Sequence, residues 1–115
     1  MTENCIFCQI VTGKAPGNIV YQDELVSAFP DQRPAAPVHL LIVPKRHITS
    51  LNRISEEDEA LLGRIIVVAR RLAEQYNISQ AGYRFIINTG MESGQTVFHL
   101  HAHLIGGQVL PGIKP

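Results

Sequence analysis

The chain has 115 residues, of which 45% are hydrophobic and 17% charged, a composition typical of a globular protein with one core. Its ten basic and ten acidic residues cancel, so it has no overall charge with which to gather nucleic acid or an anionic membrane. The N-terminus lacks a secretory signal pattern, and no apolar run approaches the roughly 18 residues that cross a bilayer. We therefore expect a cytoplasmic protein, with one domain over residues 1–115 and with neither nucleic acid nor membrane as a partner.

The first part of the chain is predicted to form one or two helical turns followed by three strands. The helical turns cover residues 5–11, and the strands cover residues 19–22, 26–29 and 38–43. The first two strands flank Asp23 and Glu24, which indicates a hairpin. Residues 31–37 hold Pro34 and Pro37 and must form a loop, and Pro44 closes the third strand.

A long helix is predicted next, beginning at Ser55 and ending near Tyr76 and Asn77. Ser55 with Asp58 three residues later is the pattern of a capping box, and the acidic first turn suits the positive end of the helix dipole. Apolar residues then recur at spacings of three and four, which predicts one buried face. This face consists of Leu61, Leu62, Ile65, Ile66, Ala69, Leu72 and Ala73.

Two more strands are predicted over residues 83–88 and 97–105, and residues 106–115 form an irregular tail. Five strands, joined mostly by short turns and accompanied by one long and one short N-terminal helix, predict an α+β fold with a mostly antiparallel sheet.

Three histidines alternate along the last predicted strand. Side chains in a strand point to opposite faces in turn, so His99, His101 and His103 are expected on one face. The other face is apolar and is expected in the core; it consists of Phe98, Leu100, Ala102 and Leu104. A histidine-rich solvated face is the alternative, but three histidines in register serve no packing purpose.

Two kinds of chemistry suit these histidines. Metal binding is one, although residues on one face lie about 6–7 Å apart, so three ligands on a straight strand would have to bend inward. Nucleophilic catalysis is the other, because neutral imidazole attacks phosphorus and forms a covalent intermediate. The preceding loop favours the second, since its small polar groups and glycine amides suit phosphate oxygens. These are Asn88, Gly90, Gly94, Gln95 and Thr96.

The run from His99 to Ile105 resembles the signature of the histidine triad family, in which three histidines alternate with apolar residues. The likeness extends from about Cys5 to Gly107 and includes residues 36–47 and 94–96. It is closest to the small, bacterial-type histidine triad nucleotide-binding proteins with an N-terminal C-x-x-C. The resemblance implies the histidine triad fold and a hydrolase or nucleotidyl transferase acting on nucleoside phosphoramidates or related adenylates. A dinucleoside polyphosphate hydrolase, or a nucleotide-binding scaffold with negligible turnover, is the alternative.

The resemblance also implies roles for individual residues. His101 would be the nucleophile, with His99, His103 and Thr96 completing the catalytic group. The phosphate contacts would be Asn88, Gly94, Gln95, Thr96 and His103. Asp31 would accept the ribose hydroxyls of a purine nucleotide or nucleotide conjugate. The base pocket would be lined by Ile6, Phe7, Ile10 and Phe29, which are equally plausible as core. Gln32 departs from the apolar residue expected there and leaves base preference open.

Cys5 and Cys8 have the C-x-x-C spacing at which two thiolates bind one zinc ion, although two buried free thiols would give the same pattern. The resemblance implies a zinc site made by Cys5, Cys8, His47 and His99. Four protein ligands leave no open position, so the zinc would be structural and not needed for the chemistry. His39 resembles a family residue that supports the triad by hydrogen bonding. The family also implies a homodimer, paired through the long helix and residues 83–88, whereas the C-terminal tail departs from the aromatic tail of close members.

Overall fold

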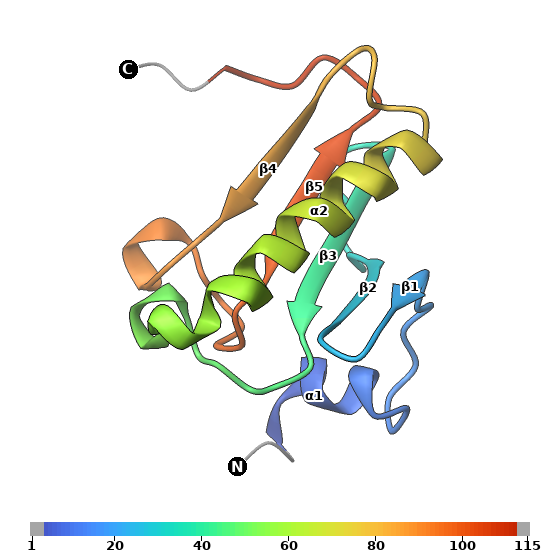
Figure 1. Ribbon diagram of the computed structural model, residues 1–115. Helices are drawn as coiled ribbons and strands as arrows, with labels where there is room; N and C mark the ends of the chain where they lie inside the picture. Colours follow the sequence, from blue (N-terminus) through green and yellow to red (C-terminus); the bar gives the residue numbers. More distant parts are fainter. Residues whose placement is uncertain (1–3, 113–115) are drawn as a thin grey trace.

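A five-stranded sheet with one long helix across it makes up the body of this computed structural model, which describes residues 4–112 (Figure 1). The helices and strands are α1 (Ile6–Val11), β1 (Tyr21–Gln22), β2 (Val26–Pro30), β3 (Val38–Pro44), α2 (Glu59–Gln75), β4 (Tyr83–Ile87) and β5 (Ala102–Gly106). Short 3₁₀ turns occur at Leu51–Arg53, Glu56–Asp58 and Met91–Ser93. The strand order is β1-β2-β3-β5-β4, and every neighbouring pair is antiparallel. The predicted α+β fold is confirmed.

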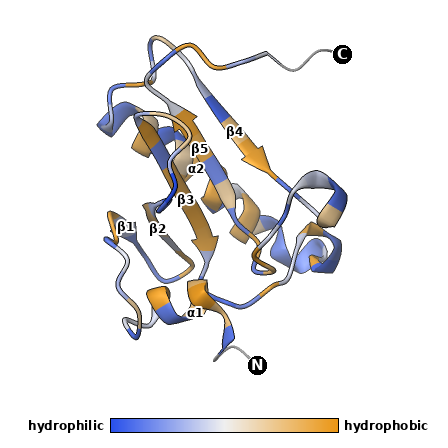
Figure 2. Cartoon of the chain, turned by 180° about the vertical axis from the view of Figure 1, so that it is seen from behind, coloured by the Kyte–Doolittle hydropathy of each residue, from blue (hydrophilic) through white to orange (hydrophobic). Residues whose placement is uncertain are grey.

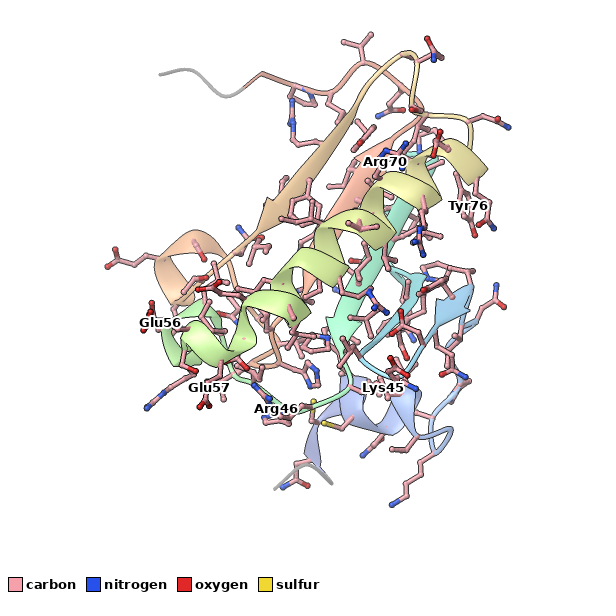
Figure 3. All side chains as sticks on the ribbon, in the orientation of Figure 1. Lys45, Arg46, Glu56, Glu57, Arg70 and Tyr76 are labelled. Carbon is pink, nitrogen blue, oxygen red and sulfur yellow. The ribbon has the colours of Figure 1, made fainter. Side chains whose placement is uncertain are left out.

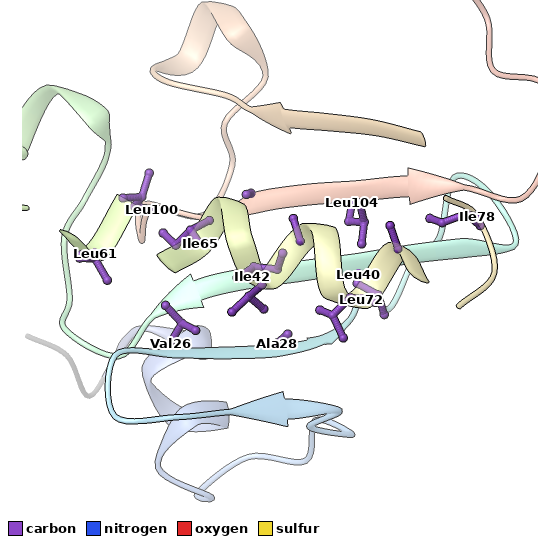
Figure 4. Packing of buried hydrophobic residues seen from close by; sticks show 14 of the residues in the cluster. Val26, Ala28, Leu40, Ile42, Leu61, Ile65, Leu72, Ile78, Leu100 and Leu104 are labelled. Carbon is purple, nitrogen blue, oxygen red and sulfur yellow. The ribbon is translucent and has the colours of Figure 1, made fainter. Parts of the chain in front are cut away.

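The central strand β3 separates two apolar clusters, because its successive side chains point to opposite faces of the sheet. Leu40 and Ile42 belong to the larger cluster, which α2 covers together with β5 residues such as Leu104 (Figure 4). Leu41 and Val43 belong to the smaller cluster on the other face, which includes residues of α1. A strand buried on both faces reads as a continuous apolar run, as residues 40–43 do.

The smaller cluster is completed by Phe7 and Ile10 from α1 and by Phe29 from β2. In the view from behind, α1 and the inner strands carry the apolar colour where they approach one another (Figure 2). The rings of Phe7 and Phe29 meet edge to face with centroids 5.5 Å apart. Apolar aromatic packing thus attaches the N-terminal helix to the sheet face that α2 does not cover.

The long helix α2 begins one turn later than the capping pattern alone suggests. Ser55 and Asp58 do form the capping box, but on the 3₁₀ turn that leads into α2. Five of the seven residues predicted for the buried face are buried, and Leu62 is partly so. Ile66 is 58% exposed, so its predicted burial is wrong: it lies about 100° around the helix from the buried Ile65. No helix among residues 4–112 is both long and apolar enough to cross a membrane.

The charged residues around α2 either stabilise the segment that leads into its N-terminus or lie at the surface. Arg46, just after β3, forms an ion pair with Asp58, which also accepts the backbone amide of Ser55. Arg70 lies 3.8 Å from Glu74 one turn along the helix and projects outward (Figure 3). The contact between Arg46 and Asp58 fixes the path of the segment between β3 and α2.

The last strand is shorter than predicted. β5 begins at Ala102, where its pairing with Ile42 and Ile87 starts, so residues 97–101 are not in a strand. The backbone amide of Leu100 instead donates to the carbonyl of Ile48, 2.6 Å away. Leu100, Ala102 and Leu104 are buried as predicted, but Phe98 is 46% exposed and not part of the core. The predicted tail begins after Gly106, and residues 113–115 lie outside the described part.

Candidate functional site

A pocket of about 690 Å³ opens on the sheet face that carries α1. Every residue predicted to bind the nucleotide lines it except Gln95, and His101 lines it as well. The predicted lining residues are Ile6, Phe7, Ile10, Phe29, Asp31, Asn88, Gly94, Thr96, His101 and His103. Those not predicted are Pro16, Gly17, Asn18, Pro30, Gln32, Arg33, Leu41 and Val97. Residues from both ends of the chain thus meet around one cavity of nucleotide size.

The three histidines are divided between two places, which corrects the prediction that all share one strand face. His101 and His103 line the pocket, whereas His99 is fully buried beside Cys5 and Cys8. Only His103 lies in β5; His99 and His101 precede it, where the backbone is no longer held in the ladder. The ring of Phe7 meets both His99 and His101 edge-on, with centroids 6.0 and 5.0 Å away.

The hydrogen bond of His101 fixes which of its ring nitrogens carries the proton. Nδ1 lies 2.7 Å from the backbone carbonyl of His99, which can only accept, so Nδ1 must carry the hydrogen. The neutral ring then keeps its lone pair on Nε2. Burial lowers the pKa of His101, and this keeps the ring neutral at neutral pH. His101 therefore lines the pocket as a neutral ring whose Nε2 keeps a lone pair.

A chain of hydrogen bonds fixes the tautomer of His103 in the opposite sense. The amide of Ala35 donates to Nδ1 of His39 at 2.9 Å, so Nε2 of His39 carries the hydrogen. That nitrogen lies 2.9 Å from Nδ1 of His103, which must accept, so His103 carries its own hydrogen on Nε2. Burial lowers the pKa of His103 to about 4, with the neighbouring rings of His101 and His39 adding to the shift. His103 therefore acts as a neutral hydrogen-bond donor.

Asp31 lies beside this relay, with Oδ2 3.4 Å from Nε2 of His39. The ligand atoms of Asp31, His39 and His103 lie within 4.8 Å of one another, a spacing that a metal ion also tolerates. A metal between the two rings would need lone pairs on Nε2 of His39 and Nδ1 of His103. The amide of Ala35 already requires the lone pair of His39 on Nδ1. The geometry therefore fits a hydrogen-bond relay and not a second metal site.

The loop between β4 and β5 is held internally by Gln95. This side chain is buried, and its amide donates to the carbonyls of Thr49 and Val97 while its oxygen accepts the amide of Gly90. The amide of Gly94 donates to the carbonyl of Met91, so the two glycine amides that the sequence suggested for phosphate are both engaged. Gln95 thus shapes the loop from behind the pocket.

Polar side chains of the same loop line the pocket directly. Asn88 donates one amide hydrogen to the carbonyl of Ser93 and retains a second, and Thr96 contributes a hydroxyl. Gly94 lines the pocket with φ of 95°, a backbone conformation that favours glycine. The pocket end next to His101 and His103 is therefore rich in hydrogen-bond donors.

The predicted metal ligands converge on one point on the other side of the triad. Nδ1 of His99 lies 3.4 Å from both Cys5 Sγ and Cys8 Sγ and 3.2 Å from Nδ1 of His47. Cys8 Sγ lies 3.3 Å from Nδ1 of His47, and all four ligand atoms are within 4.8 Å of one another. A tetrahedral zinc ion with two sulfur and two nitrogen ligands has edges of about 3.3–3.8 Å between its ligands. The donor set and its spacing fit such an ion.

The surroundings of this cluster also suit a cation. Nε2 of His99 lies 2.8 Å from the carbonyl of Pro44 and must donate to it, which leaves the lone pair on Nδ1 toward the cluster. Burial, together with Cys5, raises the pKa of the Cys8 thiol to about 11. At neutral pH this thiol would therefore lose its proton only with a cation beside it to stabilise the thiolate. His99 and His47 present nitrogen ligands to the two sulfurs. Four protein ligands leave no position for a substrate.

Several pocket residues have only a weak signal in the sequence. The loop after α1 lines the pocket with Pro16, Gly17 and Asn18. In the sequence, these residues indicate only that the helix has ended. A Cβ on Gly17 would lie 2.4 Å from Cγ2 of Ile10, so this loop can only approach α1 so closely because residue 17 is glycine. A glycine just after a helix is common, and nothing local distinguishes one that also shapes a pocket.

Comparisons with known proteins cover nearly the whole chain. The family model described as scavenger mRNA decapping enzyme C-term binding matches residues 4–112. A purine nucleoside phosphoramidase from Escherichia coli (strain K12) is 49% identical over 110 residues, which are 96% of this chain and 92% of the relative. A HIT family hydrolase from Clostridium thermocellum is 46% identical, with a TM-score of 0.94 and 98% of both chains covered. A Zn-bound histidine triad family protein from Mycobacterium smegmatis is 32% identical, with a TM-score of 0.80 and coverage of 94% of this chain and 78% of that one.

Proposed function

Because this chain belongs to the histidine triad family and is one of its hydrolases, we propose that it cleaves nucleoside phosphoramidates or related adenylates at the α-phosphorus. The observation that carries the proposal is the tautomer of His101, whose Nδ1–H is bound to the carbonyl of His99 so that Nε2 keeps its lone pair. The name of the Escherichia coli relative supports the phosphoramidate as the substrate class.

The proposed reaction has two displacements at phosphorus. In the first, Nε2 of His101 attacks, and the bond to the leaving amine, or to the leaving oxygen of an adenylate, breaks with its electron pair. In the second, water attacks the nucleotidyl-histidine, releases the nucleoside monophosphate and restores the neutral ring. Both ring nitrogens of His99 are engaged elsewhere, and His103 is neutral. In this proposal the hydroxyl of Thr96 therefore passes a proton from solvent to the leaving group, while the Nε2–H of His103 donates a hydrogen bond to the reacting phosphate.

The pocket has places for the rest of a purine nucleotide. Asn88, Thr96 and the Nε2–H of His103 bind the phosphate oxygens in this proposal, at the end where charge develops. The carboxylate of Asp31 accepts the ribose hydroxyls. The base packs against Ile6, Phe7, Ile10 and Phe29. Three of these four side chains are also buried in the smaller cluster, so the two roles suggested by the sequence are compatible.

The same proposal includes a structural zinc ion held by Cys5, Cys8, His47 and His99. The spacing of the four ligand atoms supports it, and one histidine triad relative is Zn-bound. The chemistry at His101 needs no metal. A cytoplasmic location accords with two cysteines kept reduced as metal ligands.

The proposal is tested by comparing substrates and by trapping the intermediate. We expect kcat/KM for adenosine 5′-phosphoramidate to exceed that for diadenosine tetraphosphate by about tenfold or more, because the proposed site holds one nucleotide. Rapid acid quenching followed by mass spectrometry of peptides should find adenylate attached to His101. A higher kcat/KM for diadenosine tetraphosphate than for adenosine 5′-phosphoramidate would favour a dinucleoside polyphosphate hydrolase. Nucleotide binding with neither turnover nor an adduct would favour a scaffold.

We also propose that two copies pair through α2 and β4. β4 is an edge strand with hydrogen-bonding groups unpaired on one side, and Ile66 and Val67 of α2 are 58% and 42% exposed. Sedimentation equilibrium is expected to give twice the mass of the chain, and Ile66→Glu to give the monomer. Lys14→Glu places the same acidic side chain in the loop after α1 and changes the net charge by −2 instead of −1, yet this variant should remain a dimer. A monomeric wild-type chain would refute the pairing.

A further inference from the structure

The outer rim of the pocket is polar although the wall beside it is apolar. Asn18 comes from the loop after α1, and Gln32 and Arg33 come from the loop after β2. The wall consists of Ile6, Phe7, Ile10, Phe29 and Leu41. His101 and the residues proposed to bind the phosphate line the same pocket, and they come from β5 and the loops before it. A pocket of this kind uses its few polar groups to orient and select the ligand.

The rim loops are held in place before any ligand arrives. Oδ1 of Asp31 accepts the amide of Arg33 at 2.8 Å, which closes a turn around Gln32. The amide of Asp31 donates to the carbonyl of His39 at 2.9 Å, so this turn is attached to β3. On the other side, a Cβ on Gly17 would lie 2.4 Å from Cγ2 of Ile10, so the backbone next to Asn18 lies close against α1. A backbone that is already ordered reduces the entropy that is lost when the side chains it carries bind a ligand.

The position of Gln32 relative to Asp31 indicates which part of a nucleotide it meets. This step rests on the proposed function, in which Asp31 binds the ribose. In that arrangement the base packs against Phe7 and Phe29, and its edge is left for the polar residues that line the same pocket. Gln32 is the residue next to Asp31 in the chain and also lines the pocket. Its carboxamide is therefore the nearest group in sequence that can hydrogen-bond a base edge.

We propose that Gln32, assisted by Asn18, recognises the edge of the base that carries N6 and N7 and makes the chain select adenine over guanine. A carboxamide offers one acceptor and two donor hydrogens, which match the 6-amino group and N7 of adenine in a bidentate pair. Guanine presents two acceptors, O6 and N7, at the same edge, which a carboxamide cannot match with both of its groups. Arg33, which offers donors alone, is the side chain that would favour guanine.

The test measures binding of AMP and GMP by titration calorimetry, which needs no turnover. The wild-type chain is expected to bind AMP about tenfold more tightly than GMP. Gln32→Leu, which makes the rim apolar at this position, should reduce that ratio to about twofold, and Asn18→Ala should reduce it less. Gln80→Leu removes an exposed glutamine from the turn after α2 and should keep the wild-type ratio. Circular dichroism checks folding, and Gln32→Ala, which also removes the carboxamide, replaces Gln32→Leu if the latter does not fold.

An unchanged ratio in Gln32→Leu would overturn the inference, as would a ratio that Arg33→Ala removes and Gln32→Leu retains. Failure of the proposed function gives a different result: AMP selectivity through Gln32 would persist without hydrolysis of the phosphoramidate. Hydrolysis without selectivity between the two bases would leave the proposed function standing and refute the role of Gln32. A chain that binds neither nucleotide would refute both.

Discussion

Replacing His101 with alanine is expected to lower kcat/KM for adenosine 5′-phosphoramidate by at least about 1,000-fold. In the proposed mechanism the lone pair on Nε2 of His101 attacks phosphorus, and the variant lacks this ring. The other histidine that lines the pocket, His103, carries a hydrogen on its Nε2. Binding of AMP should remain measurable, because Asp31 and the apolar wall are untouched. Initial rates and titration calorimetry on the same preparation measure the two effects separately.

The loss of activity has to be distinguished from a loss of structure. Phe7 packs against the ring of His101 with centroids 5.0 Å apart, so the substitution also removes a packing contact. His101→Gln fills more of the space than alanine and should be as inactive, since an amide is not a nucleophile toward phosphorus. Arg70→Ala, on the exposed surface of α2, serves as an active control. Wild-type turnover in either His101 variant would refute the proposed mechanism.

The elements that position this site could be predicted because their patterns are local. Residues 40–43 form an uninterrupted apolar run, and a strand that separates two clusters requires this. Ser55 and Asp58 form their capping box within four residues of one another. Burial at α2 follows the helical period except at its margin, where Ile66 is exposed. Such signals depend on neighbours in the chain and do not need the tertiary structure.

The arrangement of the triad could not be predicted in the same way. Alternation of His99, His101 and His103 with apolar residues suggests one strand, and it describes the burial of Leu100 correctly. The ladder nevertheless begins only at Ala102. The segment before it is held by the carbonyls of Pro44 and Ile48, which lie about 50 residues earlier in the chain. A sequence pattern does not contain these partners.

The roles of individual side chains in the loop between β4 and β5 could not be predicted from the sequence either. Gln95 and Thr96 are adjacent and both polar, and both were expected at the phosphate. The structure buries Gln95 in contact with Thr49, Val97 and Gly90, while Thr96 lines the pocket. Gln95 turns inward partly because it donates to the carbonyl of Thr49, which lies in a distant part of the chain. The small polar residues and glycines of the sequence identified the loop, and the geometry separates the residue that shapes it from those available to a ligand.

Loss of the proposed zinc site is the other change from which we expect a large effect. If the four ligands hold zinc as proposed, Cys8→Ser removes it and lowers the midpoint of thermal unfolding by about 10 °C or more. Cys8 contacts both His47 and His99, and His99 in turn supports the segment before β5. The N-terminal helix, the loop after β3 and the triad would therefore lose a common attachment. Metal analysis of the purified protein and scanning calorimetry measure the two changes.

A chelator separates metal loss from ordinary packing damage. A high-affinity zinc chelator should lower the unfolding midpoint of the wild-type chain toward that of Cys8→Ser and leave the variant unchanged. Val11→Ala, which removes partly buried apolar volume from the smaller cluster, should be less stable yet still respond to the chelator. Purified wild-type protein with no bound zinc, or with zinc whose removal leaves the midpoint unchanged, would contradict a structural metal. In that case Cys5 and Cys8 would be two partly buried free thiols beside His99, and the carbonyl of Pro44 would orient that ring without the help of a cation.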